Sequence, residues 1–254
     1  MLMKVIISKA MRLWGGKIIV VTNQEFINLL TSGIIELGLV VTEPKIKQLF
    51  EYYKLLLKWN RVYSLTAISD PIAFIKLHLL DGLSVVPHLK NCNSIVDVGS
   101  GMGVPAIVIA IWCPSIEVVA VDVSQKKAIF LRQVALELKL TNLEVINKKV
   151  EEYQPPKKFD VIISRAFANS NLFIKLTQHL LKDGGYWLAM KSYGVFAELE
   201  ELQDYSTTLI SVSIPDVLKY LVVKPLVIKS PVAKTQDILQ LANNQRYLLK
   251  ITLI

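Results

Sequence analysis

The 254-residue sequence contains only two cysteines, Cys92 and Cys113, and only three histidines. Two cysteines are too few for a disulfide framework or a four-cysteine zinc site, so a reducing cytoplasm is the expected location. No group of His, Cys and carboxylate residues has the spacing of metal ligands, so no metal is predicted.

Long apolar segments are also missing. The longest near-continuous apolar run is Val104–Cys113, about half of the roughly 20 residues that a membrane-spanning helix needs. This run therefore predicts a buried helix, although the mean hydropathy of the chain is +0.43. Residues 1–22 lack the small-residue cleavage pattern of a secretory signal, so they are expected to form a poorly ordered extension or to follow from an upstream start codon. A short amphipathic anchor is the weaker alternative.

Positive charge is in excess and unevenly distributed. The chain has 29 Lys and Arg against 21 Asp and Glu, a net charge of +8. Residues 1–90 hold 11 basic and 6 acidic residues, a net charge of +5, and residues 91–254 hold the remaining +3. A basic front third suits a polyanionic partner such as RNA, although a solvated lysine-rich face explains the charge equally well.

The hydrophobic pattern divides the chain into three parts. Residues 1–22 are the extension, residues 23–91 are predicted to form a helical cap, and residues 92–254 alternate between strand and helix patterns. Such alternation predicts an α/β domain, a doubly wound, mostly parallel Rossmann-like sheet with helices on both faces. The predicted strands are 94–98, 117–122, 143–147, 160–164 and 185–191, and the helices between them are 104–112, 125–139 and 172–181. Two β-branched stretches, 218–228 and 247–253, predict an antiparallel hairpin at the sheet edge.

A glycine-rich segment, Asp97-Val-Gly-Ser-Gly-Met-Gly103, follows the first predicted strand. Glycines there let a ligand approach the backbone closely, but the spacing G-x-G-x-G differs from the dinucleotide fingerprint G-x-G-x-x-G. Asp97 would repel a pyrophosphate and would attract the ammonium and sulfonium of S-adenosylmethionine. The predicted cofactor-binding residues of this segment are Asp97, Gly99, Ser100, Gly101 and Gly103. A tight turn without a ligand is the alternative.

Two further places complete the expected cofactor site. Asp122 ends the second strand, 23 positions after Gly99, where an acidic residue binds ribose hydroxyls in this topology. It is alternatively a helix N-cap, for which Ser124 is better placed. Backbone amides of Val150 and Glu151, after the third strand, are expected to contact the adenine, unless this segment is only a solvated turn.

The fourth strand ends in Ser164-Arg-Ala-Phe167, which bears on the methyl acceptor. The Asn/Asp-Pro-Pro-aromatic loop of exocyclic-amine methyltransferases is missing, and Cys113 lies far from this strand, so no thiolate nucleophile is expected. A purine N7 has a free lone pair and needs only alignment. Arg165 can fork onto guanine O6 or a phosphate and Phe167 can stack on a base; a salt-bridged Arg and a core Phe are the alternatives.

Over roughly half its length the chain resembles the GidB/RsmG family of 16S rRNA guanine-N7 methyltransferases. The shared motifs are Trp59-Asn60, Ser64-Leu-Thr-Ala-Ile68, His78-Leu-Leu-Asp81, Asp97 to Pro105, Arg132 and Ser164-Arg-Ala-Phe-Ala168. The resemblance implies a class I methyltransferase fold, S-adenosylmethionine as cofactor and the small ribosomal subunit as partner.

The resemblance also implies residue roles. Arg165 would lie beside the transferred methyl group as the catalytic residue and as a contact to the cofactor. His78 and Asp81 would face it from the cap, and Lys191 would bind substrate with Phe167. A monomer with no membrane or DNA partner is expected.

The sequence departs from the family pattern at Ser64, Gly82, Ala106, Lys149 and Ser192. Lysine at 149 cannot reproduce the planar fork of the expected arginine. Three alternatives stay open at this point: a nicotinamide-dependent oxidoreductase, a methyltransferase with a different acceptor, and a non-catalytic RNA- or ribosome-binding factor.

Overall fold

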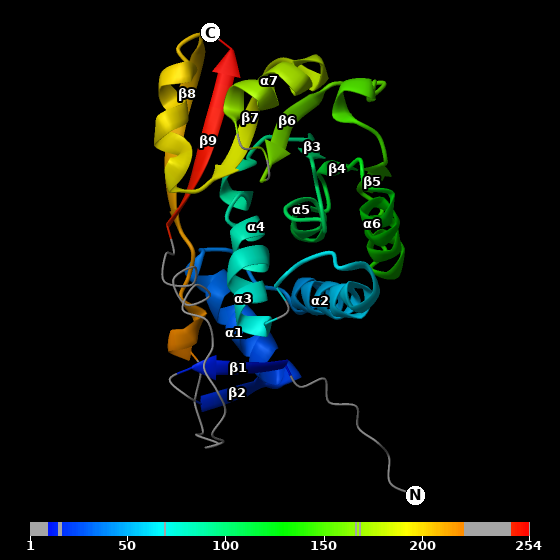
Figure 1. The fold of residues 1–254 in the computed structure, drawn as a ribbon, viewed down its shortest axis with the longest axis vertical. Coiled ribbons are helices and arrows are strands. Elements are labelled where there is room, and N and C mark those ends of the chain that lie inside the picture. The colour runs from blue at the N-terminus through cyan, green and yellow to red at the C-terminus, as the bar shows by residue number, and fades with distance from the viewer. Residues whose placement is uncertain are drawn as a thin grey trace, which may run out of the picture.

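The computed structural model describes residues 10–14, 17–68, 70–165, 167, 169–220 and 245–253. A seven-stranded sheet runs through it in the order β5-β4-β3-β6-β7-β9-β8 (Figure 1). Strands β3 to β7 of this sheet are parallel, whereas β9 is antiparallel to both β7 and β8. The strands are β3 Ser94–Val98, β4 Glu117–Val121, β5 Leu143–Ile146, β6 Phe159–Ser164, β7 Leu181–Lys191, β8 Tyr205–Ser213 and β9 Gln245–Leu253. The predicted α/β class and mostly parallel sheet are confirmed.

The central strands form here because short β-branched runs are buried on both faces of the sheet. In β3, Ile95 packs into the core on one face while Val96 and Val98 pack on the other. Helices α5, Ala106–Trp112, and α6, Gln125–Glu137, cover the first face, and α7, Ser170–Thr177, covers the second. The connection between β5 and β6 contains only a short 3-10 turn, η3, Val150–Glu152.

The cap is helical, as predicted. Its first helix, α1 Asn23–Glu36, opens with a capping box in which Thr22 and Glu25 satisfy each other's backbone amides. The second, α2 Glu43–Tyr63, has Pro44 in its first turn, where proline is tolerated. Asp70 caps a continuous column made of α3 Pro71–Phe74, the π-helix η1 Ile75–Leu80 and α4 Asp81–Leu83.

The cap helices lie beneath the sheet in Figure 1, and a single hydrophobic core joins them to it. Phe26 of α1, Leu49 of α2 and Leu80 of η1 belong to the same cluster as Ile107 of α5 and Val161 of β6. The cap therefore does not have a core of its own, and it is fixed against the sheet by apolar burial. The division at residue 91 stays a prediction.

Three expectations need correction. The poorly ordered extension is wrong for residues 10–14 and 17–21, which pair as an antiparallel hairpin, β1 Ala10–Trp14 and β2 Lys17–Val21. The strand predicted over 218–228 is wrong for 218–220, which belong to the 3-10 turn η6, Val217–Tyr220, and residues 221–228 lie outside the described residues.

The third correction concerns the sheet edge. Residues 247–253 do form an antiparallel strand near the sheet edge, but the edge strand that pairs with β9 is β8, Tyr205–Ser213. This strand was missed because it lies at the edge of the sheet, where none of its nine residues is buried and the hydrophobic signal is weak. The fifth predicted strand is also longer than expected, since β7 begins at Leu181, directly after the 3-10 turn η4, Gln178–Leu180.

Candidate active site

The glycine loop between β3 and α5 contains three residues in the left-handed region, Gly99, Gly101 and Gly103, with φ of +71°, +61° and +101°. A Cβ at Gly99 would meet nothing within 4 Å, and one at Gly101 would meet only the Gly99 carbonyl at 3.8 Å. A Cβ at Gly103 would collide with Ile107 and Leu131. Gly99 and Gly101 thus leave an open backbone surface for a ligand, whereas Gly103 allows α5 and α6 to pack closely.

Asp97 is buried directly beneath this loop, with 1% of the residue exposed. Its Oδ2 accepts hydrogen bonds from the Ser100 hydroxyl at 2.6 Å and the Ala106 amide at 3.2 Å. Its Oδ1 is also buried and has no hydrogen-bond partner among the described residues. Burial raises the pKa of Asp97 to about 6, so a cationic group placed at Oδ1 would relieve a desolvated carboxylate. This unpartnered oxygen fits the ammonium of S-adenosylmethionine.

Asp122 lies at the carboxyl end of β4, next to the loop. Its Oδ2 accepts from the Gly101 amide and its Oδ1 from the Ser124 amide, both at 2.8 Å. Ser124 occupies the N-cap position of α6 without a side-chain capping bond. Lys127 Nζ lies 3.9 Å from Asp122 Oδ2. Asp122 therefore holds the glycine loop, and its ribose contact stays a prediction.

One residue that holds the loop was missed by the sequence analysis. Tyr52 of α2 is fully buried, and its hydroxyl donates to the Met102 carbonyl at 2.8 Å. Burial raises the pKa of Tyr52 well above its usual value, so the hydroxyl remains a donor. Tyr52 looks like any core position of an amphipathic helix, and no local pattern separates it from its neighbours.

The turn after β5 is only partly accessible. Val150 is buried in the second core, while Glu151 and Glu152 are exposed. The Glu152 amide donates to the Lys149 carbonyl at 3.1 Å. The adenine contact expected of the Val150 and Glu151 amides stays a prediction.

Arg165, just beyond β6, is bound to the cap column. Its Nη1 lies 3.0 Å from the Leu77 carbonyl, 3.0 Å from His78 Nδ1 and 3.6 Å from Asp81 Oδ2. His78 and Asp81 are each 6% exposed, and His78 also lies 3.5 Å from the Thr66 hydroxyl. The structure thus brings together three of the predicted site residues. Arg165 contacts both His78 and Asp81 through the same nitrogen.

Asp81 has a second basic neighbour that no local pattern predicts. Arg246 of β9 places Nε 3.5 Å from Asp81 Oδ1. Burial raises the pKa of Asp81, and the two guanidinium groups of Arg165 and Arg246 oppose that rise. The π-helix that carries His78 is itself a feature often found at functional sites.

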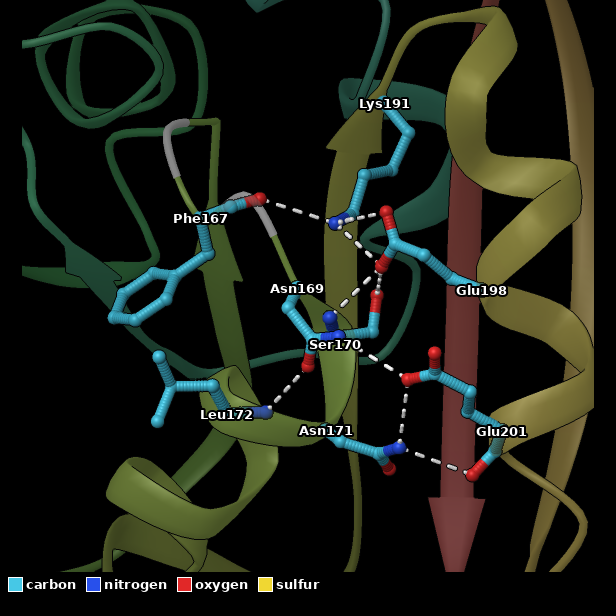
Figure 2. A network of polar contacts seen from close by, with 8 residues as sticks. All are labelled: Phe167, Asn169, Ser170, Asn171, Leu172, Lys191, Glu198 and Glu201. Carbon is cyan, nitrogen blue, oxygen red and sulfur yellow. Dashed lines mark hydrogen bonds and ion pairs between the residues drawn. The ribbon is translucent and has the colours of Figure 1, made fainter.

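Lys191, predicted to bind substrate, is enclosed by protein groups (Figure 2). Its Nζ donates to the Phe167 carbonyl at 3.0 Å and to both carboxylate oxygens of Glu198, at 3.0 and 2.8 Å. The Phe167 ring lies 5.1 Å from that of Phe173 and is partly packed against the second core. The substrate-binding roles of Lys191 and Phe167 stay predictions.

Gly82, one of the departures from the family pattern, lies against α5. A Cβ there would lie 3.2 Å from both Val104 Cγ1 and Val108 Cγ2.

Among the residues that the structure describes, no group of three or more His, Cys, Asp or Glu could hold a metal ion. No helix within that part of the chain is long and apolar enough to cross a membrane.

The strand order, with antiparallel β9 between β7 and β8, and the open glycine loop at the carboxyl edge define a class I methyltransferase fold. Residues 45–219 match the GidB family, described as rRNA small subunit methyltransferase G. The chain belongs to this family. The predicted resemblance is therefore confirmed, and a nicotinamide-dependent oxidoreductase is excluded.

Named relatives agree with the family. The chain is 44% identical over 198 residues to a ribosomal RNA small subunit methyltransferase G of Methylobacillus flagellatus, covering 77% of this chain and 96% of that one. It is 47% identical over 170 residues to the protein of the same name from Chromobacterium violaceum, covering 67% and 81%. Among solved structures, a precorrin-6y C5,15-methyltransferase from Geobacter metallireducens is similar with a TM-score of 0.45 at 13% identity, covering 76% of this chain and 93% of that one. Membership of a methyltransferase family implies the use of S-adenosylmethionine.

Proposed function

We propose that this protein transfers a methyl group from S-adenosylmethionine to N7 of a guanine in 16S rRNA, with the small ribosomal subunit as its substrate particle. The observation that carries the proposal is the unpartnered Oδ1 of Asp97 beneath an open glycine loop, in a chain that belongs to a family of rRNA methyltransferases. A cytoplasmic location and a monomeric state belong to the same proposal.

The loop residues have separate tasks in cofactor binding. Asp97 Oδ1 would accept from the ammonium of the methionine part, and Gly99 and Gly101 would let the ligand lie against the backbone. Asp122, already bonded to the Gly101 amide, would accept from the ribose hydroxyls. Bound in this way, the cofactor supplies an electrophilic methyl group on a sulfonium.

The residues expected to contact the guanine acceptor would position the base rather than transfer a proton. Burial and the nearby Arg165 lower the pKa of His78 to about 3, so this imidazole is a poor general base at neutral pH. N7 of guanine needs none, because it carries no proton and attacks through its lone pair. Arg165 has five N–H donors, and its contacts to Leu77, His78 and Asp81 all use Nη1, which is compatible with a fork onto guanine O6 or a phosphate.

A basic and aromatic rim lies next to Asp122, which Lys127 Nζ approaches to 3.9 Å. It is formed by Arg61 and Tyr63 at the end of α2 and by Lys126 and Lys127 at the start of α6. Lys126 Nζ donates to the Tyr63 carbonyl at 3.2 Å, which joins the two helices. The Tyr63 ring is stacked on Trp59 at 5.2 Å, and the residue is 43% exposed. This rim would bind RNA phosphates through its cations and a splayed base through Tyr63.

The test uses labelled S-adenosylmethionine and small ribosomal subunits from cells that lack this methyltransferase. We expect the label in 16S rRNA, recovered as 7-methylguanosine after digestion. The variant Asp122→Asn should lose most of the incorporation of label. The control is Asp183→Asn, the same change at an exposed carboxylate near the amino end of β7, and it should keep the incorporation.

No label in 16S rRNA would reject the activity. Label on another atom or on another acceptor would support a methyltransferase of different specificity. Cofactor binding together with particle binding and no transfer would support the non-catalytic ribosome-binding factor instead.

A further inference from the structure

Arg165, Phe167 and Asn169 lie on the connection between β6 and α7, and a buried ion pair from another part of the chain binds the Phe167 carbonyl (Figure 2). Lys191, the last residue of β7, has a side chain only 7% exposed, and that of Glu198 is 15% exposed. Glu198 lies on η5, the 3-10 segment Tyr193–Glu201 that follows β7. These two residues therefore reach the connection from the neighbouring strand and the segment after it.

The pair binds the middle of this connection and the first residue of the helix that follows it. Lys191 donates to the Phe167 carbonyl, two residues after Arg165. Glu198 Oε2 accepts from the Ser170 amide at 2.8 Å and the Ser170 hydroxyl at 2.5 Å, where α7 begins. Glu198 also accepts from Lys191 through both of its oxygens. One carboxylate thus fixes the lysine and the helix start together.

We propose that Glu198 is a positioning residue for methyl transfer, acting through Lys191 on the connection that carries Arg165 and Phe167. This inference rests on the proposed function, and it adds a residue to which neither the sequence motifs nor the family description assigns a role. An ammonium buried to this degree keeps its charge and its place only beside a compensating carboxylate. Without Glu198, the anchor on the Phe167 carbonyl is lost, so the backbone that follows Arg165 and carries Phe167 is no longer fixed on this side of the site.

The charge state of the pair agrees with this role. Burial favours the neutral carboxyl group of Glu198, but hydrogen bonds from Lys191 and Ser170 outweigh it, so the pKa lies below its usual value. Glu198 is therefore ionised at neutral pH and opposes the buried ammonium with a full charge.

Glu201 provides a matched control on the same segment. Its Oε2 accepts from the side-chain amides of Asn169 and Asn171, at 3.1 and 3.3 Å, so it also contacts the start of α7. It makes no contact with Lys191 or Phe167 in Figure 2. The change Glu201→Gln therefore perturbs α7 without touching the anchor.

The first experiment is amide hydrogen exchange of the peptide covering residues 165–172, which needs only the purified protein. We expect Glu198→Gln to speed exchange in this peptide by about tenfold and Glu201→Gln to leave residues 165–168 unchanged. Because an unpaired buried ammonium can destabilise the whole fold, the double variant Lys191→Met/Glu198→Gln removes both charges. It should fold and still show the faster exchange, since the Phe167 carbonyl has lost its donor.

The second experiment is steady-state methyl transfer to small ribosomal subunits. Glu198→Gln should lower kcat by about tenfold, with KM for the particle and Kd for S-adenosylmethionine within about twofold of wild type. Glu198→Asp should recover part of kcat, and Glu201→Gln should keep it.

Unchanged exchange and unchanged kcat in Glu198→Gln would overturn the inference, as would an equal loss of kcat in Glu201→Gln. If the wild-type protein methylates no rRNA, the proposed function fails, and the exchange measurement alone decides whether Glu198 holds the connection.

Discussion

Arg165 Nη1 lies 3.0 Å from His78 Nδ1, and this contact fixes the chemical form of the imidazole. An arginine only donates, so Nδ1 accepts, and the neutral ring carries its proton on Nε2, which faces the Thr66 hydroxyl at 3.5 Å. Burial and the adjacent guanidinium both oppose a second proton on the ring.

This geometry predicts an acid sensitivity of folding. The pKa of His78 is about 3 in the folded protein against 6.5 for the ordinary side chain, so the unfolded chain binds more protons between these values. The free energy of unfolding should therefore fall as pH drops below 6.5, with His78 contributing about 2 kcal/mol of the loss by pH 5. Urea unfolding at pH 7.5 and pH 5.0 measures it, and His78→Gln should lose less stability by that amount. Equal losses in both proteins would contradict the prediction.

Cofactor affinity should depend on the ionisation of Asp97. Burial raises the pKa of Asp97 to about 6, against the lowering effects of Ser100, Ala106 and Arg165, and nearby Asp122 adds to the rise. An ammonium binds the ionised carboxylate, so each pH unit below about 6 should weaken the Kd for S-adenosylmethionine by up to tenfold.

Calorimetric titration at pH 5.0, 6.0 and 7.5 tests this dependence on Asp97. The variant Asp97→Asn should bind weakly with a flat pH profile. A wild-type Kd that does not change between pH 5.0 and 7.5 would place the ammonium elsewhere.

The two kinds of glycine in the loop should respond differently to alanine. Gly99→Ala adds a Cβ in open space at a positive φ, so it should cost about 1 kcal/mol of stability while obstructing the cofactor. Gly103→Ala adds the same strain and a clash with Ile107, so it should cost about 2–4 kcal/mol. Thermal unfolding and cofactor titration on both variants separate these effects. The prediction fails if Gly99→Ala binds the cofactor as well as wild type.

The rim formed by Arg61, Tyr63, Lys126 and Lys127 should contribute to RNA affinity. Tyr63→Ala should weaken binding of a single-stranded 16S rRNA fragment by about tenfold, because stacking on an aromatic ring is lost. Arg61→Gln should reduce the slope of log K against log salt by about 1. Fluorescence anisotropy measures both. Lys158→Gln, a matched loss of charge just before β6, should behave like wild type, and equal effects at 61 and 158 would argue against a specific rim.

Much of the fold follows from local patterns. The strands 94–98 and 117–121 and the helix start at Gln125 were predicted to within a residue, because alternating short apolar runs and helical spacing are local signals. The edge strand β8 was missed for the converse reason: a strand with little burial needs no apolar pattern. The hairpin at residues 10–21 was missed because its short basic and apolar mixture resembles an unstructured extension.

The candidate site shows the same division. The glycine loop could be predicted from the sequence, because three glycines at alternate positions are typical of a turn with positive φ angles. By contrast, Tyr52, Glu198 and Arg246 gave no signal, since each has an ordinary place on a helix, a turn or a strand. Their partners lie 50, 7 and 165 residues away. The contacts of Tyr52 and Arg246 therefore form only when the cap packs against the sheet and its loops.

By itself, the sequence determined the parallel sheet, the helical cap and the loop at which a sulfonium nucleoside is expected to bind, because spacing and glycine content act over a few residues. Only the tertiary structure decided how that loop is used. It leaves one oxygen of Asp97 without a partner in the part of the chain that the structure describes, makes Arg165 a shared donor for His78 and Asp81, and encloses Lys191 with Glu198. These relations depend on which side chains the crossovers and the cap bring together, and burial then sets their charge and hydrogen bonding.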